Sequence, residues 1–344
     1  MSDKSYNRGC GLLIIEVRNS NPNGDPDQEG VPRQRNDGHG EISPVSFKRK
    51  LRDLVEDKEG EIWQHFSADL KLKKERFQIL ESRERSWQQV KDDITGDRTG
   101  ETFKNKYWDG RLFGNTWLES TKEENTDNDQ TQAAAGATAQ PELKGAKPTL
   151  TAEEKKLIRG IIKTGAVKFG MGISIEPLPE VRRLTQTKKA GAQEGMDRGM
   201  APLSYNVIIY AVYTMPFFVN PSTGRKSGCV KEDIELMLHL IPLAYPHTAS
   251  AIRPDVNVRV AHYIEHKSAL GSFQDCAMID ALTPSPRVPP NDATKDLLAK
   301  NYIVPKWEDL DEKLHSSAAS YRELVSEFLG NSCAATSSNG TVGT

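Results

Sequence analysis

Long apolar runs and closely spaced cysteines are both missing from this sequence of 344 residues. No apolar stretch approaches the roughly 20 residues that cross a bilayer, so we expect no membrane span. The four cysteines lie far apart and form no Cys-x-x-Cys pair, which disfavours both a zinc site and a disulfide framework. No apolar segment follows the charged first residues, so secretion is not indicated. These absences predict a soluble protein of the reducing cytoplasm.

An excess of positive charge is also missing, because the formal net charge is −2 at pH 7. A protein that coats nucleic acid indiscriminately relies on many uncompensated basic residues, and this balance argues against such a protein. Any contact with nucleic acid must therefore use cations that are concentrated locally. Residues 42–52 carry four basic residues and no acid, whereas residues 119–129 carry five acids and one lysine.

The first part of the chain predicts a strand, a loop and a helix. An apolar, β-rich run at 10–17 is typical of a buried strand, and a long turn-rich loop follows it. The Ser-Pro pair at 43–44 is typical of a helix start, with the serine as N-cap and the proline as first helical residue. Helical periodicity then places Lys48 and Arg52 together on one flank of the apolar stripe, and Lys50 on the other.

Composition divides the middle of the chain. Residues 61–93 are highly charged and predict helix, and residues 121–147 turn acidic and then rich in Ala, Gly and Gln, which predicts a flexible insertion. Thr151 and Glu154 form a capping box that predicts a further helix, ending near Gly160. The remaining predicted elements are, in order, strands at 165–177 and 206–220, a helix at 231–241, a strand at 255–264 and an amphipathic helix at 307–328.

This order predicts an α+β protein. It follows the strand-helix-strand-strand-helix-strand plan of a ferredoxin-like, or RNA-recognition-motif-like, sheet with large excursions. We expect such a sheet to have one open face, over which RNA-binding domains of this plan lay single-stranded RNA. The plan alone also hosts many other functions.

The strongest motif is NPNGDPD at 21–27, which continues through Val-Pro-Arg at 31–33 into ISPVSFKRKLRD at 42–53. These residues resemble the signature of the Cascade backbone subunit, the Cas-seven family of CRISPR proteins, and above all its forms in subtypes I-C and I-B. Further blocks follow in family order, namely WDGRLFG at 108–114, TGAVKFGMGISIEP at 164–177 and GMDRG at 195–199. The combination is specific, although any single block would be weak.

The resemblance covers most of residues 10–270 and implies a right-hand-shaped fold. The implied parts are a ferredoxin-like palm, a helical fingers insertion and a protruding thumb hairpin. The expected boundaries are 1–58, 159–176 and 206–330 for the palm, 59–158 for the fingers with their flexible acidic and Ala-rich segment, 177–205 for the thumb and 331–344 for a disordered tail.

The resemblance also implies a function, that of a non-catalytic subunit that oligomerises along the CRISPR RNA (crRNA) and presents this guide to target DNA in antiviral defence. The implied partners are the crRNA, the target DNA, further copies of the chain in a filament, the other Cascade subunits (a Cas-five-type end cap, a large and a small subunit) and a recruited helicase-nuclease. No cofactor, metal or membrane is expected.

Phosphate-holding chemistry gives the candidate site. A guide must be held by its phosphates while its bases stay free, so its contacts should be cationic or made by backbone. Basic residues near a helix N-terminus combine their charge with the helix dipole. By resemblance, Gly170 lies where backbone approaches RNA, and Met171 where an apolar side chain packs against a nucleotide. The RNA contacts that the resemblance implies are Asn21, Asn23, Arg33, Ser43, Lys48, Arg52, Gly170, Met171 and the thumb cations Arg182, Arg183, Lys188, Lys189 and Arg198.

Plainer readings remain open for these residues. Lys48 to Arg52 could be only a solvated helix flank, Gly170 only a strand irregularity, and the thumb an ordinary surface loop. A scaffold that binds only proteins is a further alternative. Another is an RNA endonuclease of the same superfamily that uses a loop aspartate, for which Asp25, Asp27 and Asp37 are candidates. A loop rich in Asp, Asn, Pro and Gly is more often turn chemistry.

Two enzyme-like patterns carry little weight. His262 and His266 spell an inverted zinc-protease motif, which requires a helix, whereas this segment predicts a strand that would hold the two histidines about 13 Å apart. Residues 224–227 resemble the end of a phosphate loop but lack the upstream glycine at the required spacing. We therefore expect no catalytic residues.

Overall fold

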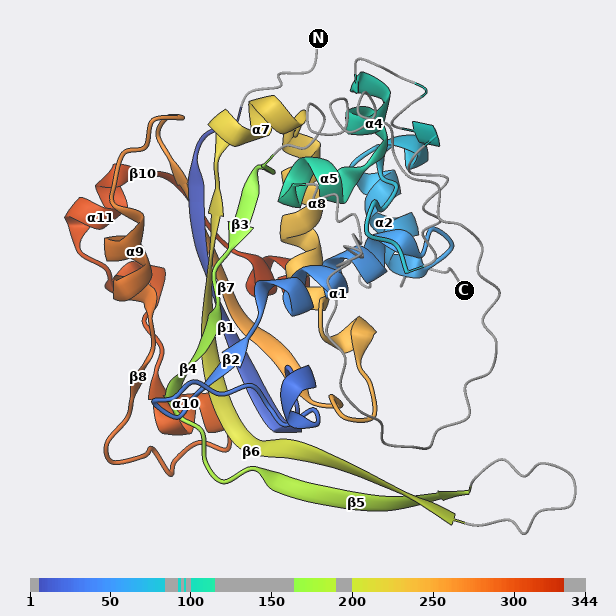
Figure 1. Ribbon diagram of the computed structural model, residues 1–344. Coiled ribbons are helices and arrows are strands. Elements are labelled where there is room, and N and C mark those ends of the chain that lie inside the picture. The colour runs from blue at the N-terminus through green and yellow to red at the C-terminus, as the bar shows by residue number, and fades with distance from the viewer. Residues whose placement is uncertain are drawn as a thin grey trace, which may run out of the picture.

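The protein is built on one antiparallel sheet. The computed structural model describes residues 6–83, 92–93, 96, 100–114, 164–189 and 200–330. The strand order is β10-β7-β1-β6-β4-β2, and β3 and β5 also pair with β6 (Figure 1). The sheet strands are β1 (Gly9–Ser20), β2 (His39–Ile42), β3 (Val167–Phe169), β4 (Gly172–Pro177), β5 (Arg182–Lys189), β6 (Met200–Val219), β7 (Val256–His266) and β10 (Ala318–Glu323), and a separate pair is formed by β8 (Ser285–Pro286) and β9 (Tyr302–Ile303).

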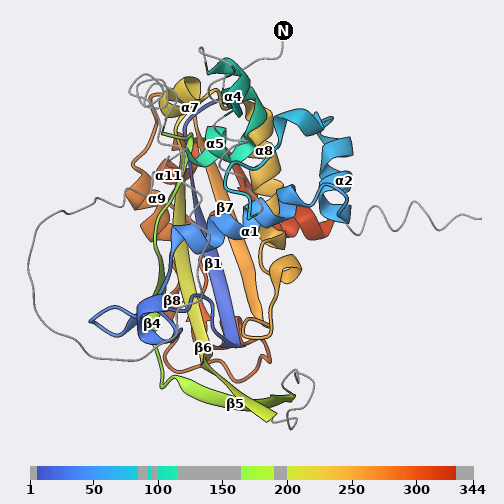
Figure 2. The same ribbon diagram turned by 45° about the vertical axis from the view of Figure 1, so that its right-hand side comes forward.

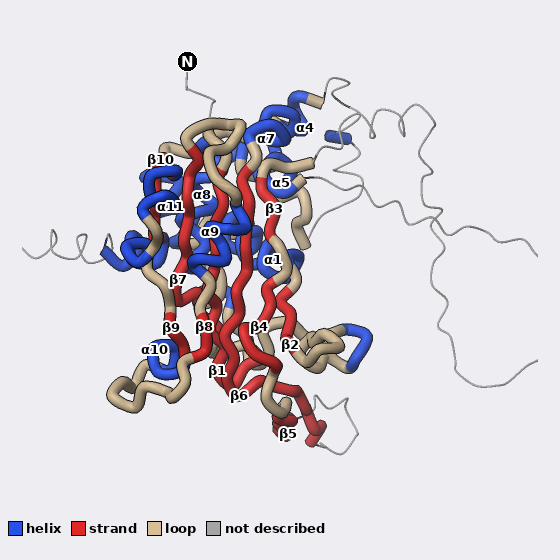
Figure 3. The backbone as a smooth tube through the Cα atoms, turned by 90° about the vertical axis from the view of Figure 1, so that its left-hand side faces the viewer, coloured by secondary structure: helices blue, strands red, loops and turns tan. Residues whose placement is uncertain are grey.

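Helices cover both faces of this sheet, as Figures 1 and 3 show. On one side are α1 (Pro44–Glu56), α2 (Glu61–Asp69), α4 (Glu101–Lys106), α5 (Trp108–Phe113), α7 (Pro221–Ser227) and α8 (Lys231–Leu240). On the other are α9 (Asp275–Leu282), α10 (Leu297–Asn301) and α11 (Glu312–Ser317). The short 3-10 turns are η1 (Pro26–Gln28), η2 (Lys74–Arg76), η3 (Ile241–Leu243), η4 (Pro246–Thr248) and η5 (Trp307–Asp309).

The expected open sheet face is absent from the described part of the chain, so that prediction is wrong. Leu13 and Ile15 of β1 are buried in the core beneath α1 and α8. Leu12 and Ile14, which point the other way, are also at most 1% exposed. They pack against side chains of the carboxyl-terminal region, among them Met278 of α9 and Leu298 of α10. A continuous apolar run predicts a strand that is buried on both faces, so the run at 10–17 already contained this signal.

Several predicted elements are confirmed. The run at 10–17 lies in β1, the strand at 206–220 in β6, the helix at 231–241 in α8 and the strand at 255–264 in β7. Ser43 caps α1, since its hydroxyl oxygen accepts a hydrogen bond from the Ser46 amide at 3.2 Å. The strand predicted at 165–177 is present but divided into β3 and β4 by Gly170 and Met171.

Two segments that predicted single helices are interrupted. In the charged segment at 61–93, α2 ends at Asp69, Lys71 takes a left-handed backbone conformation with φ of 52°, and the 3-10 turn η2 follows; residues 84–91 lie outside the described part, and residues 92–93 are again helical. The segment at 307–328 contains η5, α11 and the strand β10, and it becomes helical again from Leu324. Tyr321 of β10 stacks on Trp307 at 4.4 Å between ring centroids, and its strand pairs with β7. Tertiary contacts thus override the helical period there. The helix predicted at 151–160 lies outside the described residues.

A two-stranded arm extends from one end of the sheet (Figures 1 and 2). It is formed by β5 and the first part of β6, in a register that runs from Arg182 opposite Val207 to Lys189 opposite Met200. Beyond the arm, β6 continues into the middle of the sheet, where Ile208 pairs with Ser20 of β1. Because one strand belongs to both parts, the base of the arm is fixed to the sheet.

Candidate nucleic-acid interface

Two asparagines shape the loop before α1. The side-chain oxygen of Asn23 accepts the Ser43 amide at 2.8 Å, and its backbone carbonyl accepts the Arg33 amide at 2.9 Å. The side-chain nitrogen of Asn21 donates to the Gly30 carbonyl at 2.7 Å. Both side chains are nearly buried, since Asn21 is 1% exposed and Asn23 is 9% exposed. Their contacts therefore position Arg33 and Ser43, and direct RNA contacts by the two amides stay a prediction.

The aspartates of this loop also hold turns. A carboxylate oxygen of Asp25 accepts the Asp27 amide at 3.1 Å, and another lies 3.8 Å from Arg33 Nε. Asp37 accepts the His39 amide at 3.1 Å, and this backbone hydrogen bond is the main cause that lowers the pKa of the Asp37 carboxyl. A lowered pKa makes a weaker base, so Asp37 is not prepared for proton abstraction near neutral pH.

Two lysines come together where α1 meets the sheet. Phe47 of α1 packs on Phe169 of β3 at 5.1 Å between ring centroids, and their neighbours Lys48 and Lys168 lie close enough that the charge of Lys168 acts on Lys48. Burial and the charge of Arg52 lower the pKa of Lys48; the charge of Glu81 opposes this shift, and that of Lys168 adds to it. Neither lysine forms an ion pair with a carboxylate in the part of the chain that is described.

Gly170 and Met171 lie beside this lysine pair, at the break between β3 and β4. The Gly170 amide donates to the Pro216 carbonyl at 2.7 Å, and a side-chain carbon at this glycine would lie 2.8 Å from the Pro216 ring. Only glycine fits so close an approach. Met171 is 37% exposed although it is apolar. Two cations and an exposed thioether together form a surface that can hold an extended phosphate chain and pack against one of its nucleotides.

Arg52, by contrast, has partners within the protein. It is 3% exposed, and its Nε donates to the Asp109 carboxylate at 2.9 Å, while a second guanidinium nitrogen lies 3.1 Å from Glu81. Asp109 is itself buried and also accepts the Leu80 amide at 2.7 Å. An RNA contact by Arg52 stays a prediction, but any substitution there would also break a buried ion pair.

The WDGRLFG block at 108–114 forms a buried junction whose role the sequence did not indicate. Arg111 makes two hydrogen bonds to the Asp233 carboxylate, at 2.9 and 2.7 Å, and donates to three backbone carbonyls. Trp108 Nε1 donates to the Asp233 carbonyl at 3.1 Å. This junction holds α5 on α8. The alternation of Asp and Arg in an otherwise apolar block was the available signal.

The arm carries part of the expected cation set. Arg182 and Arg183 are exposed and, as consecutive strand residues, point to opposite faces of the ribbon. Arg183 donates to the Ser204 hydroxyl at 3.0 Å. Lys188 and Lys189 occupy the register positions opposite Ala201 and Met200. Arg198 lies outside the described residues.

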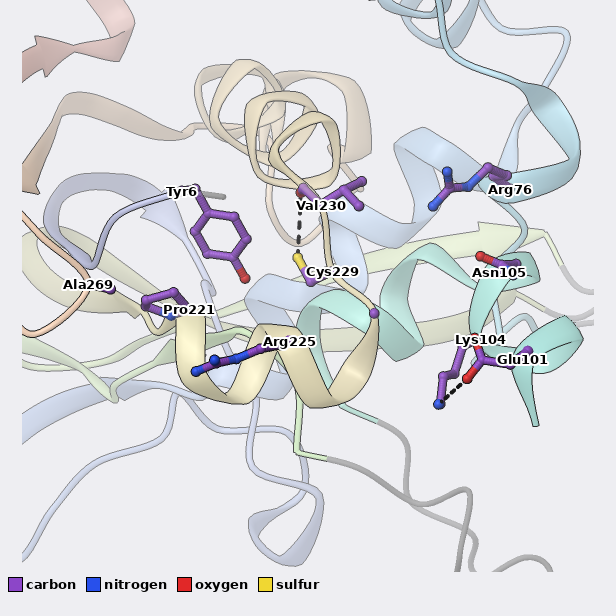
Figure 4. Close-up of a pocket in the computed structure, with 11 residues that line it drawn as sticks. Tyr6, Arg76, Glu101, Lys104, Asn105, Pro221, Arg225, Cys229, Val230 and Ala269 are labelled. Atoms are coloured by element: carbon purple, nitrogen blue, oxygen red, sulfur yellow. Dashed lines mark hydrogen bonds and ion pairs between the residues drawn. The ribbon is translucent and has the colours of Figure 1, made fainter. Parts of the chain in front are cut away.

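A cavity of about 710 Å³ lies at the end of the sheet far from the arm, and its lining includes Arg76, Lys104, Arg225 and Cys229 (Figure 4). Burial raises the pKa of the Cys229 thiol well above its usual value, and Sγ lies 3.7 Å from the Val230 carbonyl oxygen. A thiol with a raised pKa stays protonated, so Cys229 is not an activated nucleophile.

His262 and His266 both lie on β7, as the strand prediction requires, and each has a separate partner. His262 Nδ1 is 2.9 Å from the Tyr321 hydroxyl, and His266 Nε2 is 2.8 Å from the Asp275 carboxylate. Over the described ranges, no group of three or more His, Cys, Asp or Glu side chains is placed to hold a metal ion. Within the same ranges, no helix has the length and apolarity that crossing a bilayer requires.

The sheet and the helices on its two faces define a mixed α/β protein. The arm and the edge that carries Lys48 and Lys168 give it a surface suited to an extended anionic ligand. The chain belongs to the CRISPR-associated protein Cas7 family, whose sequence profile matches residues 7–301. This result confirms the family to which the sequence motifs pointed. No curated protein matches the chain in sequence.

Solved structures with a related fold come from CRISPR assemblies. One, described as a "CRISPR RNA-guided surveillance complex, pre-nicking", shares 13% identity with a TM-score of 0.41, over 75% of this chain and 78% of that chain. A second "CRISPR RNA-guided surveillance complex" shares 14% identity with a TM-score of 0.33, over 75% and 69%. A chain of the "Type III-B Cmr-beta bound to cognate target RNA" shares 11% identity with a TM-score of 0.33, over 76% and 62%. These likenesses are loose, and the family assignment rests on the sequence profile.

Proposed function

We propose that this protein is the non-catalytic, crRNA-binding backbone subunit of a type I Cascade complex, of subtype I-C or I-B. The observation that carries the proposal is the pair Lys48 and Lys168, which makes no ion pair with a carboxylate in the described part of the chain and lies beside Gly170 and the exposed Met171. Lys48 is half-buried and Lys168 is exposed, so two positive charges face this edge and favour an anion from outside the chain.

In this proposal, the guide follows the edge of the sheet near α1 and β3 and does not cross a sheet face. The helices on both faces support this path, because they leave no open face in the described part of the chain. Phosphates meet the two lysines and Arg33, while bases stay free to pair with target DNA. Base pairing then reads the sequence, and the protein supplies geometry and charge.

The finer architecture and the partners belong to the same proposal. The order β7-β1-β6-β4, with α1 between β1 and β4 and α8 between β6 and β7, supports a ferredoxin-like palm. The projecting arm, with Arg182 and Arg183 exposed, supports a thumb that reaches a neighbouring copy in a filament. The end-cap, large and small subunits and the helicase-nuclease would join that filament.

Charge reversal tests the lysine pair. Lys48→Glu combined with Lys168→Glu should abolish co-purification of RNA, as judged by the absorbance ratio and a denaturing gel, because two phosphate contacts become repulsive. Lys267→Glu combined with Lys295→Glu is the matched control, since both lysines are exposed and lie in the part of the chain beyond β7. Intact RNA loading in the first variant, or RNA-free wild-type protein, would overturn the proposed function.

A further inference from the structure

The cavity of about 710 Å³ at the end of the sheet far from the arm has an excess of positive charge. Its charged lining residues are three cations, Arg76, Lys104 and Arg225, and one acid, Glu101. Lys104 pairs with Glu101 at 2.7 Å. Within the described ranges, neither arginine makes an ion pair or a side-chain hydrogen bond, and the buried Nε of Arg76 has no acceptor. We call this hollow the cationic cavity.

The cations of the cationic cavity come from three separate elements, as Figure 4 shows. Arg76 belongs to η2, Lys104 to α4 and Arg225 to α7. Because they lie on different sides of the hollow, several negative groups are needed to complement them. Apolar side chains complete the lining, among them those of Tyr6 and Val230. A lining of this kind suits an extended ligand that carries several acidic groups and some apolar ones.

The chain itself contains a sequence of matching chemistry. Residues 119–129, here called the acidic segment, carry five acids against the single cation Lys122. Two apolar residues, Trp117 and Leu118, directly precede them. This sequence therefore offers both the carboxylates and the apolar groups that would complement the lining.

The acidic segment also follows a helix that borders the cationic cavity. Gly228 lines the cavity, and a side-chain carbon there would lie 3.7 Å from Lys104 Cβ and 3.8 Å from Arg111 Cδ. Arg111 belongs to α5, which is capped at its end by Gly114. Glu119 follows Gly114 by five positions, a stretch that spans at most about 17 Å. The start of the acidic segment is therefore within reach of the cavity, at an effective concentration on the order of millimolar.

We propose that the cationic cavity is a binding site for an acidic peptide and that its occupant is the acidic segment of the same chain. Carboxylates of the segment pair with Arg76 and Arg225, and they give the buried Nε of Arg76 an acceptor. The segment is favoured over nucleic acid because any polyanion from solution must compete with a tethered one. The inference does not require that the protein bind RNA. It would leave fewer free cations at this end of the sheet for nucleic acid to contact.

Trypsin tests the occupancy of the cavity, because Lys122 is the one cleavage point within the acidic segment and Lys144 is the next along the chain. The full-length protein, freed of RNA, is digested briefly and the two cuts are quantified by mass spectrometry. Arg76→Gln combined with Arg225→Gln should raise the rate of cleavage at Lys122, relative to Lys144, about tenfold, because the segment loses two charged partners. Added salt should raise the same ratio in the wild-type protein.

Lys267→Gln combined with Lys295→Gln is the matched control. Both lysines are exposed and neither lines the cationic cavity, so this variant loses the same amount of charge elsewhere. We expect its cleavage ratio to equal that of the wild-type protein.

A labelled peptide of residues 115–131 tests the cavity directly and leaves its lining intact. The receptor is a full-length variant in which each acid of the segment is replaced by its amide: Glu119→Gln, Glu123→Gln, Glu124→Gln, Asp127→Asn and Asp129→Asn. We expect the peptide to bind this variant at least about tenfold more tightly than the wild-type protein, whose cavity is occupied. Adding Arg76→Gln and Arg225→Gln to the receptor should remove that advantage. A peptide with the same five amides is the control and should not bind.

Four results would overturn the inference. The first is an unchanged cleavage ratio in Arg76→Gln with Arg225→Gln, and the second is equal peptide affinity of the wild-type protein and the five-amide variant. The third is a wild-type cleavage ratio that rises on dilution, which would assign the segment to the cavity of a neighbouring copy. The fourth is loss of RNA affinity in Arg76→Gln with Arg225→Gln without a change in cleavage, which would assign the cavity to nucleic acid. If that variant fails to fold, the peptide titration decides.

Discussion

Lys48 and Arg52 lie one turn apart on α1 and contact the same aromatic ring, yet their surroundings differ. Lys48 Nζ is 5.6 Å and the Arg52 guanidinium carbon 5.2 Å from the Phe113 centroid. Arg52 is paired with the buried carboxylate of Asp109, whereas Lys48 makes no ion pair in the described part of the chain and lies near enough to Glu81 and Lys168 to be affected by their charges. Membership of a basic motif therefore does not decide the role of a cation. The presence or absence of an acid partner separates those that hold the fold from those that can hold a ligand.

The largest expected effect on stability comes from removing the ion pair between Arg52 and Asp109. Arg52→Met should lower the free energy of unfolding of the RNA-free protein by about 3 kcal/mol, because it leaves the Asp109 carboxylate buried without its cation. Lys48→Met should change that free energy by less than about 1 kcal/mol and should instead weaken RNA binding about tenfold. Urea unfolding measures the free energy of unfolding of each variant, and RNA titration measures its affinity for RNA.

Arg83→Met is the control for loss of an arginine that pairs with an acid of α1. Arg83 is 71% exposed, so its ion pair with Asp53 is a surface pair and should contribute little to stability. The comparison fails if Arg52→Met unfolds like the wild-type protein and loses more RNA affinity than Lys48→Met. In that case Arg52 would contact RNA in spite of its ion pair with Asp109.

His262 is a buried group that avoids the cost of a buried charge by staying neutral. Its protonation at low pH should change the free energy of unfolding by an amount similar to that of Arg52→Met. Burial lowers the pKa of His262 to about 4, against a smaller opposing influence of Glu323 and Glu308. The unfolded chain, with a histidine pKa near 6.5, binds a proton more readily than the folded chain, so stability falls as pH drops below about 6.5. The loss at pH 4 amounts to about 3 kcal/mol from this residue.

Urea unfolding of the RNA-free protein at pH 7, 6, 5 and 4 measures this dependence. His262→Phe keeps a ring beside Tyr321 and has no proton to gain, so its stability should depend less steeply on pH over this range. His65→Phe is the control, because His65 is exposed. Equal slopes in wild type and His262→Phe would show that His262 is not the group that resists acid.

Local signals were reliable where local chemistry decides the structure. The cap at Ser43 and the alternation of β7 depend on neighbours in sequence, and both were predicted. Arg52 could not be assigned in this way, because its partner Asp109 lies 57 residues away and only the fold brings the two together. Lys168 was overlooked, although its position between the buried Val167 and Phe169 in a strand already places it outward.

The smallest expected effect concerns the loop aspartates, which would be the decisive residues in an endonuclease. Asp25→Ala removes the acceptor for the Asp27 amide and the neighbour of Arg33, so it should cost about 0.5–1 kcal/mol of unfolding free energy. Asp25→Asn keeps the acceptor and should cost less.

Because these carboxylates serve turns and belong to no metal-binding group in the described chain, we expect no cleavage. RNA complementary to the guide should stay intact both with the wild-type protein and with the double variant Asp25→Ala and Asp27→Ala. The measurement is a denaturing gel after incubation with magnesium. Evenly spaced cuts with the wild-type protein that vanish with the double variant would contradict a non-catalytic role and would show that the loop aspartates act on RNA.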